Sequence, residues 1–262
     1  MADLEAIIFD VDGTLADTER DGHRRAFNAA FADVGLDWDW TVERYGRLLG
    51  VTGGKERIRA YLRAERPEFE PPQPLDAFVK ELHRRKTEHY VAMMRTGNIP
   101  LRAGVLRLLR EARAAGVRLA IATTTTPENV SALLASAPEP GLLGWFEVIA
   151  AGDVVARKKP APDIFELALR DLGLPPSACV VIEDSDNGVR SALAAGLKAV
   201  LVTVSSYTVG QDFTGAPLVV DRLGEPDAPA TAVAGDLAGA SYVDLHVLRA
   251  LRERTFGTAA GD

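Results

Sequence analysis

Short runs of apolar residues recur along the chain, and segments with helical apolar spacing lie between them. Strands that are covered on both faces of a sheet give such continuous apolar runs. Helical spacing runs through residues 105–112 and 164–172, with Gly116 and Gly173 as end signals. This alternation predicts an α/β fold, a doubly wound Rossmann-like parallel sheet. Its expected strands are residues 7–9, 117–122, 147–151, 179–182, 199–204 and 218–220.

One long stretch, from about residue 17 to about residue 98, contains only helical patterns. The expected helices are residues 24–34, 55–64 and 75–94, and the aromatic residues Phe27, Phe31, Trp38 and Trp40 are expected to form their core. Because the stretch leaves the sheet after the first strand and returns before the second, its two linkers should lie side by side. Such an insertion can act as a mobile cap.

The pattern therefore predicts a core domain, an inserted cap and a C-terminal extension. We expect the core domain to comprise residues 1–16 and 100–223 and the α-helical cap domain residues 17–99. Residues 224–262 read as an irregular loop rich in Gly, Pro and Ala, followed by an amphipathic helix.

Composition narrows the range of partners. The 262 residues are 47% apolar and 26% charged, as in an ordinary globular protein, and the formal net charge is −7. That charge argues against nucleic acid and anionic membrane surfaces as partners, because both are bound with Lys and Arg. The single cysteine, Cys179, lies in an apolar run and is expected to be buried. With no signal peptide and no run that spans a bilayer, we expect a cytoplasmic protein, or one in a plastid stroma-like compartment after loss of a transit peptide.

Two carboxylates, Asp10 and Asp12, stand directly after the first apolar run. Alternate residues of an extended strand project to the same side, so both should face one place. Two carboxylates that close repel each other unless a cation is present, and Mg²⁺ prefers oxygen ligands. Taken alone, the pair could equally be an Asp-Gly turn after a strand.

Three further groups follow other strands of the predicted sheet. Glu183 and Asp184 come after one strand, Thr123 and Thr124 end another, and Lys159 lies in a basic loop. Ligands of open α/β sheets gather beyond the carboxyl ends of the strands. The residues together supply a nucleophile, a metal site, a proton shuttle and donors for phosphate oxygens, as phosphoryl transfer requires. They leave open whether Asp10 or Asp12 attacks.

These motifs resemble those of the haloacid dehalogenase superfamily over roughly residues 5–222, with DVDGT at residues 10–14 as the first motif. The resemblance implies Mg²⁺ as cofactor and Asp10 as the nucleophile that forms an aspartyl-phosphate. It implies that Asp12 protonates the leaving oxygen, activates water and ligates the metal through its backbone carbonyl. Thr123 and Lys159 would then hold the phosphoryl oxygens, with the Thr124 backbone N–H as a further donor.

In the same resemblance Asp184 is a metal ligand, and Glu183 ligates the metal or orders its water. The position of the cap resembles the β-phosphoglucomutase-like subfamily. The cap segments 18–24, 35–38 and 52–58 look like those of CbbY-type phosphatases of the Calvin cycle, which remove a phosphate from xylulose 1,5-bisphosphate.

The cap supplies the candidate substrate-binding residues Glu19, His23, Lys55 and Arg57. Most charged residues on helices are simply solvated, but glycines before Lys55 would let a phosphate approach the start of a helix. Lys55 with Arg57 or His23 could bind a second phosphate, and Glu19 a sugar hydroxyl.

The sequence thus predicts a phosphatase of a small phosphorylated sugar. A phosphomutase or a phosphatase of another sugar monophosphate shares the same motifs. A hydrolytic dehalogenase fits less well because it needs neither Asp12 nor the acidic pair. A protein that binds phosphate without catalysis is the remote alternative, and the sequence does not indicate an oligomeric state.

Overall fold

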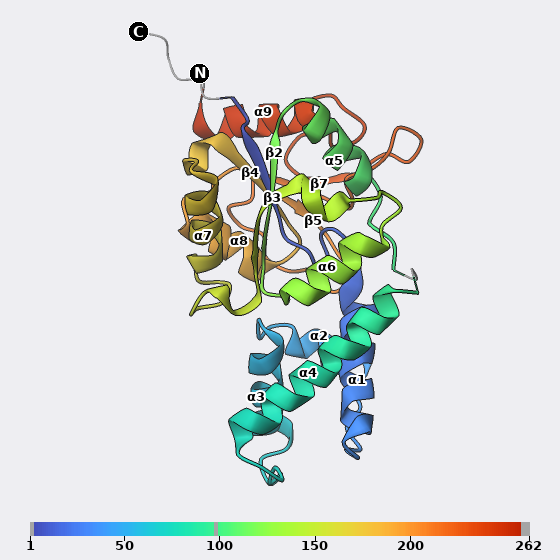
Figure 1. Cartoon of the computed structure of the whole chain (residues 1–262). Coiled ribbons are helices and arrows are strands. Elements are labelled where there is room, and N and C mark those ends of the chain that lie inside the picture. The colour runs from blue at the N-terminus through green and yellow to red at the C-terminus, as the bar shows by residue number, and fades with distance from the viewer. Residues whose placement is uncertain (1–2, 97–98, 258–262) are drawn as a thin grey trace.

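A computed structural model describes residues 3–96 and 99–257. Its centre is a seven-stranded sheet in the order β3-β2-β1-β4-β5-β6-β7, seen in Figure 1. The first six strands in this order pair in parallel, and β7 joins antiparallel at the edge. The strands are β1 (Ala6–Phe9), β2 (Arg118–Thr123), β3 (Phe146–Ala151), β4 (Cys179–Glu183), β5 (Val200–Thr203), β6 (Leu218–Val220) and β7 (Ala232–Ala234). The predicted α/β fold is confirmed, and β1 to β6 each begin and end within one residue of the predicted ranges.

Successive side chains of the strands point to opposite faces of the sheet and pack into two separate apolar layers. Ile7 and Phe9 pack with α5, α6 and α9, whereas Ala6 and Ile8 pack with α7 and α8 on the opposite face. Figure 1 shows α7 and α8 on one side of the sheet and α5 and α6 on the other. These helices are α5 (Val105–Ala114), α6 (Pro127–Ser136), α7 (Asp163–Leu172), α8 (Asp186–Ala194) and α9 (Leu245–Phe256), and the short 3₁₀ turns are η2 (Leu142–Trp145), η3 (Gly152–Val154) and η4 (Pro176–Ala178).

A helical unit stands beyond the end of the sheet at which β1 ends (Figure 1). Its helices are η1, a π-helix (Glu19–His23), α1 (Arg24–Asp33), α2 (Val42–Leu48), α3 (Gly54–Glu65) and α4 (Leu75–Met94). Its core contains the four predicted aromatic residues, all buried, together with Tyr45 and Tyr61. The expected helices are present, and η1 and α2 are additional ones.

The two linkers of the helical unit lie side by side, as predicted. Ala16 and Leu101 form an isolated antiparallel bridge, and the Arg102 backbone N–H donates to the Leu15 carbonyl at 2.9 Å. The Arg102 guanidinium also donates to the carbonyl oxygens of Gly13 and Thr203. These two linkers are therefore hydrogen-bonded to the loop that carries the first acidic residues.

The C-terminal extension differs from the expected irregular segment in one respect, because it adds β7 to the sheet before α9. In the range expected to be the cap, residues 97–98 lie outside the described residues, as do residues 1–2 and 258–262 at the two ends. Within the described ranges, every helix is too short or too polar to cross a bilayer.

Candidate active site

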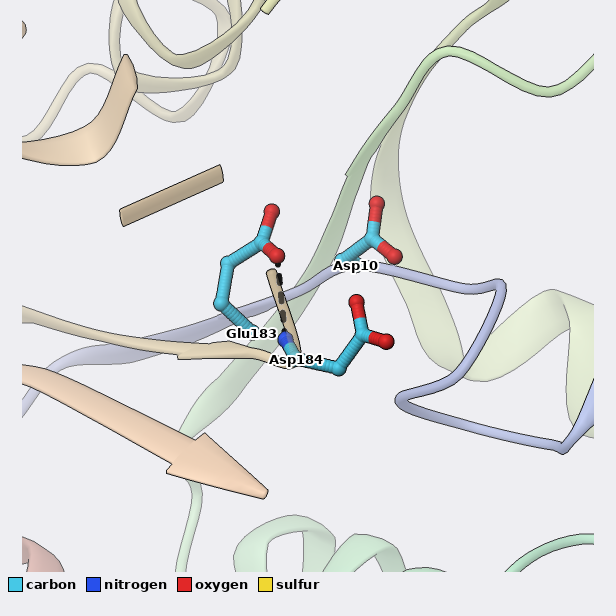
Figure 2. A group of neighbouring side chains, drawn as sticks. All are labelled: Asp10, Glu183 and Asp184. Atoms are coloured by element: carbon cyan, nitrogen blue, oxygen red, sulfur yellow. Dashed lines mark hydrogen bonds between the residues drawn. The ribbon is translucent and has the colours of Figure 1, made fainter. Parts of the chain in front are cut away.

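Three carboxylates meet where neighbouring parallel strands end. Asp10 follows β1 and Asp184 follows β4, while Glu183 is the last residue of β4. The strands are adjacent, and the Asp10 backbone N–H donates to the Ile182 carbonyl at 3.0 Å. Figure 2 shows the three side chains close together, with a Glu183 oxygen directed at the Asp184 backbone N–H. One oxygen from each carboxylate lies within 4.8 Å of the others, and all three residues are buried.

Lys159 provides the counter-charge for this group. Its ammonium donates to Asp10 Oδ1 at 2.7 Å, to Glu183 Oε1 at 2.5 Å and to the Ala122 carbonyl at 2.9 Å. A lysine has three N–H donors, so each finds an acceptor. Burial would lower the pKa of Lys159, but Asp10 and Glu183 raise it above its usual value. The two carboxylates therefore favour the charged form of Lys159 beside the nucleophile candidate.

The carboxylates nevertheless carry more negative charge than Lys159 neutralises. Burial raises the pKa of Asp10 to about 7, with Glu183 adding to the shift and Lys159 opposing it. Burial, with Glu183 and Asp10, also raises the pKa of Asp184 well above its usual value. A cation at this point would reverse both shifts.

The space around the carboxylates is kept open by glycine. Gly13 has a φ of 87°, and a Cβ there would lie 2.1 Å from Asp184 Oδ2. Hard carboxylate oxygens in a buried, negatively charged cluster suit Mg²⁺. The residues present therefore fit a divalent cation, which Asp10 and Asp184 would hold. Glu183 is already engaged by Lys159 and by the Asp184 backbone N–H.

Asp12 turns away from this cluster toward the helical unit. Its Oδ1 accepts from the Thr18 hydroxyl at 2.5 Å and contacts His23 Nε2 at 2.8 Å. Burial would raise the pKa of Asp12, but His23 and Thr18 outweigh it and lower the pKa to about 2. The two aspartates that sequence reasoning left interchangeable thus have separate environments: Asp10 faces Lys159 and the acidic pair, and Asp12 faces Thr18 and His23.

A buried lysine completes the contacts of His23. Lys86 Nζ lies 2.7 Å from His23 Nδ1. Since an ammonium only donates, Nδ1 accepts, and the proton of a neutral imidazole lies on Nε2, where it is donated to Asp12. Lys86 was not predicted, although it occupies the buried face of α4 four residues from both Leu82 and Tyr90. A charged residue within an apolar stripe was the available signal.

We expect Lys86→Met to lower kcat about tenfold and to remove an alkaline limb from the pH profile. Burial lowers the pKa of Lys86 to about 8, so in the wild type the ammonium that fixes the His23 tautomer is lost as pH rises through about 8. The measurement is kcat between pH 6 and pH 10, with exposed Lys80→Met on the same helix as the control. An unchanged alkaline limb in Lys86→Met would exclude this role.

A cavity of about 400 Å³ lies over these groups and brings most of the predicted residues together. It is lined, among others, by Asp10, Asp12, Glu19, Arg57, Thr123, Thr124, Lys159 and Asp184. Glu183 is fully buried behind Lys159, and His23 borders a smaller adjoining recess.

Two cap residues are held in the cavity wall by Tyr45, which sequence reasoning assigned no role. Its hydroxyl donates to Glu19 Oε2 at 2.5 Å and accepts from Arg57 Nη1 at 2.8 Å. Arg57 also donates from Nε to the Leu48 carbonyl. Both charged side chains therefore have hydrogen-bond partners within the cavity wall.

Lys55 is placed differently from the other predicted residues. It is not among the residues that line the cavity, and its ammonium pairs with Asp153 in η3. Asp153 also pairs with Lys158 Nζ at 2.7 Å, and hydrogen bonds from Lys158 and Lys55 lower the pKa of Asp153 to about 2. Lys55 thus connects α3 of the helical unit to η3, which follows β3 of the sheet.

We expect Lys55→Met to change kcat/KM no more than about fivefold, since partly exposed ion pairs contribute about 1 kcal/mol or less. Asp153→Asn breaks the same pair from the other side and should have the same effect in steady-state assays. If Lys55→Met lowers kcat/KM a hundredfold while Asp153→Asn does not, Lys55 contacts the substrate directly.

Comparison with known proteins identifies the family of this chain. The model of the haloacid dehalogenase-like hydrolase family matches residues 4–196. Protein CbbY of Cereibacter sphaeroides is 50% identical over 222 residues, which cover 85% of this chain and 94% of that protein. The plasmid-encoded CbbY of Cupriavidus necator is 46% identical over 254 residues, covering 96% and 98%.

A solved structure is similar over the same range. The D10N mutant of CbbY from Rhodobacter sphaeroides, crystallised with xylulose-(1,5)bisphosphate, has a TM-score of 0.78 and 50% identity, covering 84% of this chain and 94% of that chain. The chain therefore belongs to the haloacid dehalogenase-like hydrolase family, is a phosphatase, and within that family resembles the CbbY proteins.

Proposed function

We propose that the protein hydrolyses a sugar phosphate with Mg²⁺ and an aspartyl-phosphate intermediate, and that xylulose 1,5-bisphosphate is its substrate. The observation that carries the proposal is the pairing of Asp10 with Lys159 at the floor of the cavity, beside Asp184. A carboxylate nucleophile needs a nearby cation to meet a phosphate dianion, and Lys159 supplies one.

The proposed reaction has two steps. An Asp10 carboxylate oxygen attacks phosphorus, the bond from phosphorus to the sugar oxygen breaks, and that oxygen takes a proton from Asp12. Asp12 then removes a proton from water, which attacks phosphorus and releases inorganic phosphate and free Asp10. The phosphate charge beside Asp12 raises its pKa and favours the protonated form that the first step uses.

Mg²⁺ would be held by Asp10, Asp184 and the backbone carbonyl of Asp12, and Glu183 would order the water bound to the metal. When bound, it neutralises charge on the phosphoryl oxygens. Thr123, at the end of β2, and the neighbouring Thr124 provide donors on the other side of the cavity.

The substrate assignment rests on the cap and on the relatives. Residues 17–99 act as a cap that presents Glu19 to a sugar hydroxyl and Arg57 to a second anionic group. The D10N mutant of CbbY from Rhodobacter sphaeroides has been crystallised with xylulose-(1,5)bisphosphate, and it is 50% identical to this chain over the matched residues. A cavity of about 400 Å³ is within the size range of small-molecule sites.

A substrate panel tests this assignment. Phosphate release is measured with xylulose 1,5-bisphosphate, ribulose 1,5-bisphosphate, glucose 1-phosphate and fructose 1-phosphate, and sugar products are followed by chromatography. We expect the highest kcat/KM for xylulose 1,5-bisphosphate. Preference for a monophosphate would contradict the assignment of a bisphosphate substrate, while the assignment of the protein as a phosphatase would remain. Interconversion of hexose phosphates without net phosphate release would instead identify a phosphomutase.

A further inference from the structure

A tyrosine of the core domain reaches the cap from a short turn after β5. The turn is fastened at both ends: the Ser205 backbone N–H donates to Thr208 Oγ1 at 2.8 Å, and the Thr208 backbone N–H donates to the Ser205 carbonyl at 3.1 Å. Tyr207 lies between these anchors and borders the catalytic cavity. The Tyr207 side chain is partly buried, whereas Val209, two residues on, is largely exposed.

The Tyr207 ring fits closely against α2 of the cap. Its centroid lies 5.9 Å from that of Tyr45, with the rings inclined at 61°. A Cβ at Gly46 would lie 3.2 Å from two carbons of the Tyr207 ring. Glycine within a helix costs about 1 kcal/mol relative to alanine, and here it permits this approach. Of the described apolar residues that pack on the aromatic core of the cap, Tyr207 is the one contributed by the core domain.

The contact between Tyr207 and Tyr45 is linked by hydrogen bonds to two charged residues of the cavity wall. Tyr45, on which the Tyr207 ring packs, holds Glu19 and Arg57 through its hydroxyl. The position of Tyr45 therefore determines where Glu19 and Arg57 lie relative to the catalytic carboxylates.

We propose that Tyr207 is a positioning residue: its ring docks the cap and, through Tyr45, places Glu19 and Arg57 for the sugar substrate. This inference rests on the proposed function, because it concerns recognition of a sugar phosphate in the same cavity. The ring and not the hydroxyl carries the role. Within the described residues the buried Tyr207 oxygen has no hydrogen-bond partner.

Four variants test the role with two substrates, xylulose 1,5-bisphosphate and p-nitrophenyl phosphate, a small ester without sugar hydroxyls or a second phosphate. Tyr207→Ala should lower the ratio of kcat/KM for the bisphosphate to that for the ester by about 10- to 100-fold, because misplacing a positioning group by about 1 Å has effects of this size. Tyr207→Phe keeps the ring and should keep the ratio within about threefold of the wild type. A purely structural defect would lower turnover of both substrates together.

Gly46→Ala disturbs the same contact from the side of the cap and should also lower the ratio of kcat/KM for the bisphosphate to that for the ester. Because both changes disturb one contact, the double variant Gly46→Ala/Tyr207→Ala should lose less than the product of the two single losses. An unchanged ratio in Tyr207→Ala, equal losses in Tyr207→Phe and Tyr207→Ala, or fully multiplicative losses would each overturn the inference.

The proposed function is judged separately, from the wild type. If the wild type releases phosphate from none of the sugar phosphates, the proposed function fails. If it prefers a different sugar phosphate, that compound replaces the bisphosphate in the ratio, and the prediction for Tyr207 is unchanged.

Discussion

Asp10→Asn is expected to lower phosphate release by at least about 10⁴-fold, since removal of a nucleophile removes the whole covalent pathway. The asparagine Oδ1 can still accept the hydrogen bond from Lys159, which the carboxylate accepts at 2.7 Å. The geometry of the cavity should therefore survive, and the loss should lie in kcat. The matched control is exposed Asp171→Asn, on α7 of the same domain, which should have wild-type turnover.

The same substitution should not destabilise the metal-free protein. The pKa of Asp10 is raised from 3.8 to about 7 by burial, so between these values the folded state binds a proton more tightly than the unfolded state. The free energy of unfolding of the metal-free wild type therefore falls as pH rises from about 4 to about 7, and Asp10→Asn should remove that part of the slope. Urea unfolding at several pH values in EDTA measures it. Substantial turnover in Asp10→Asn with an intact fold would overturn the assignment of the nucleophile.

Lys159→Met is expected to have the second-largest effect, a loss of about 10³-fold in kcat, comparable to removal of a group that stabilises the transition state. It should also destabilise the metal-free protein by about 3 to 5 kcal/mol, because Asp10 and Glu183 lose their buried counter-charge. Both quantities are measurable, by steady-state assays and by urea unfolding in EDTA.

The neighbouring Lys158→Met is the natural control, because Lys158 pairs with the exposed Asp153 and should change stability by less than about 1 kcal/mol. If Lys159→Met does not fold, Lys159→Met/Glu183→Gln removes one of the unpaired charges and should recover part of the stability. Equal effects of Lys158→Met and Lys159→Met would contradict the role of Lys159.

The functional residues at the strand ends could be predicted because the pattern that marks them lies within a few neighbouring residues of the sequence. Asp10, Thr123 and Asp184 each follow or end a buried apolar run, and parallel strands bring such positions to one edge of the sheet. The separate environments of Asp10 and Asp12 could not be predicted in this way. They depend on Lys159 and His23, which are far from each other in the chain and reach the site through tertiary packing.

The cap was predicted less completely for the same reason. Charged residues on its helices look alike in sequence, and only the packing distinguishes Arg57, which lines the cavity, from Lys55, which pairs with Asp153. The helix α2 was missed because it has seven residues and contains Gly46, and β7 because three exposed residues give no usable period. Tyr45 lies in α2 and Tyr207 follows β5, so the two are far apart in the chain and no sequence pattern connects them.

The central claim, a Mg²⁺-dependent phosphatase with Asp10 as the attacking group, is tested most directly by one assay. Phosphate release from xylulose 1,5-bisphosphate is followed for the wild type and for Asp10→Asn, each with Mg²⁺ and with EDTA. We expect phosphate release only by the wild type with Mg²⁺. Equal release by the wild type in EDTA, or by Asp10→Asn with Mg²⁺, would contradict it.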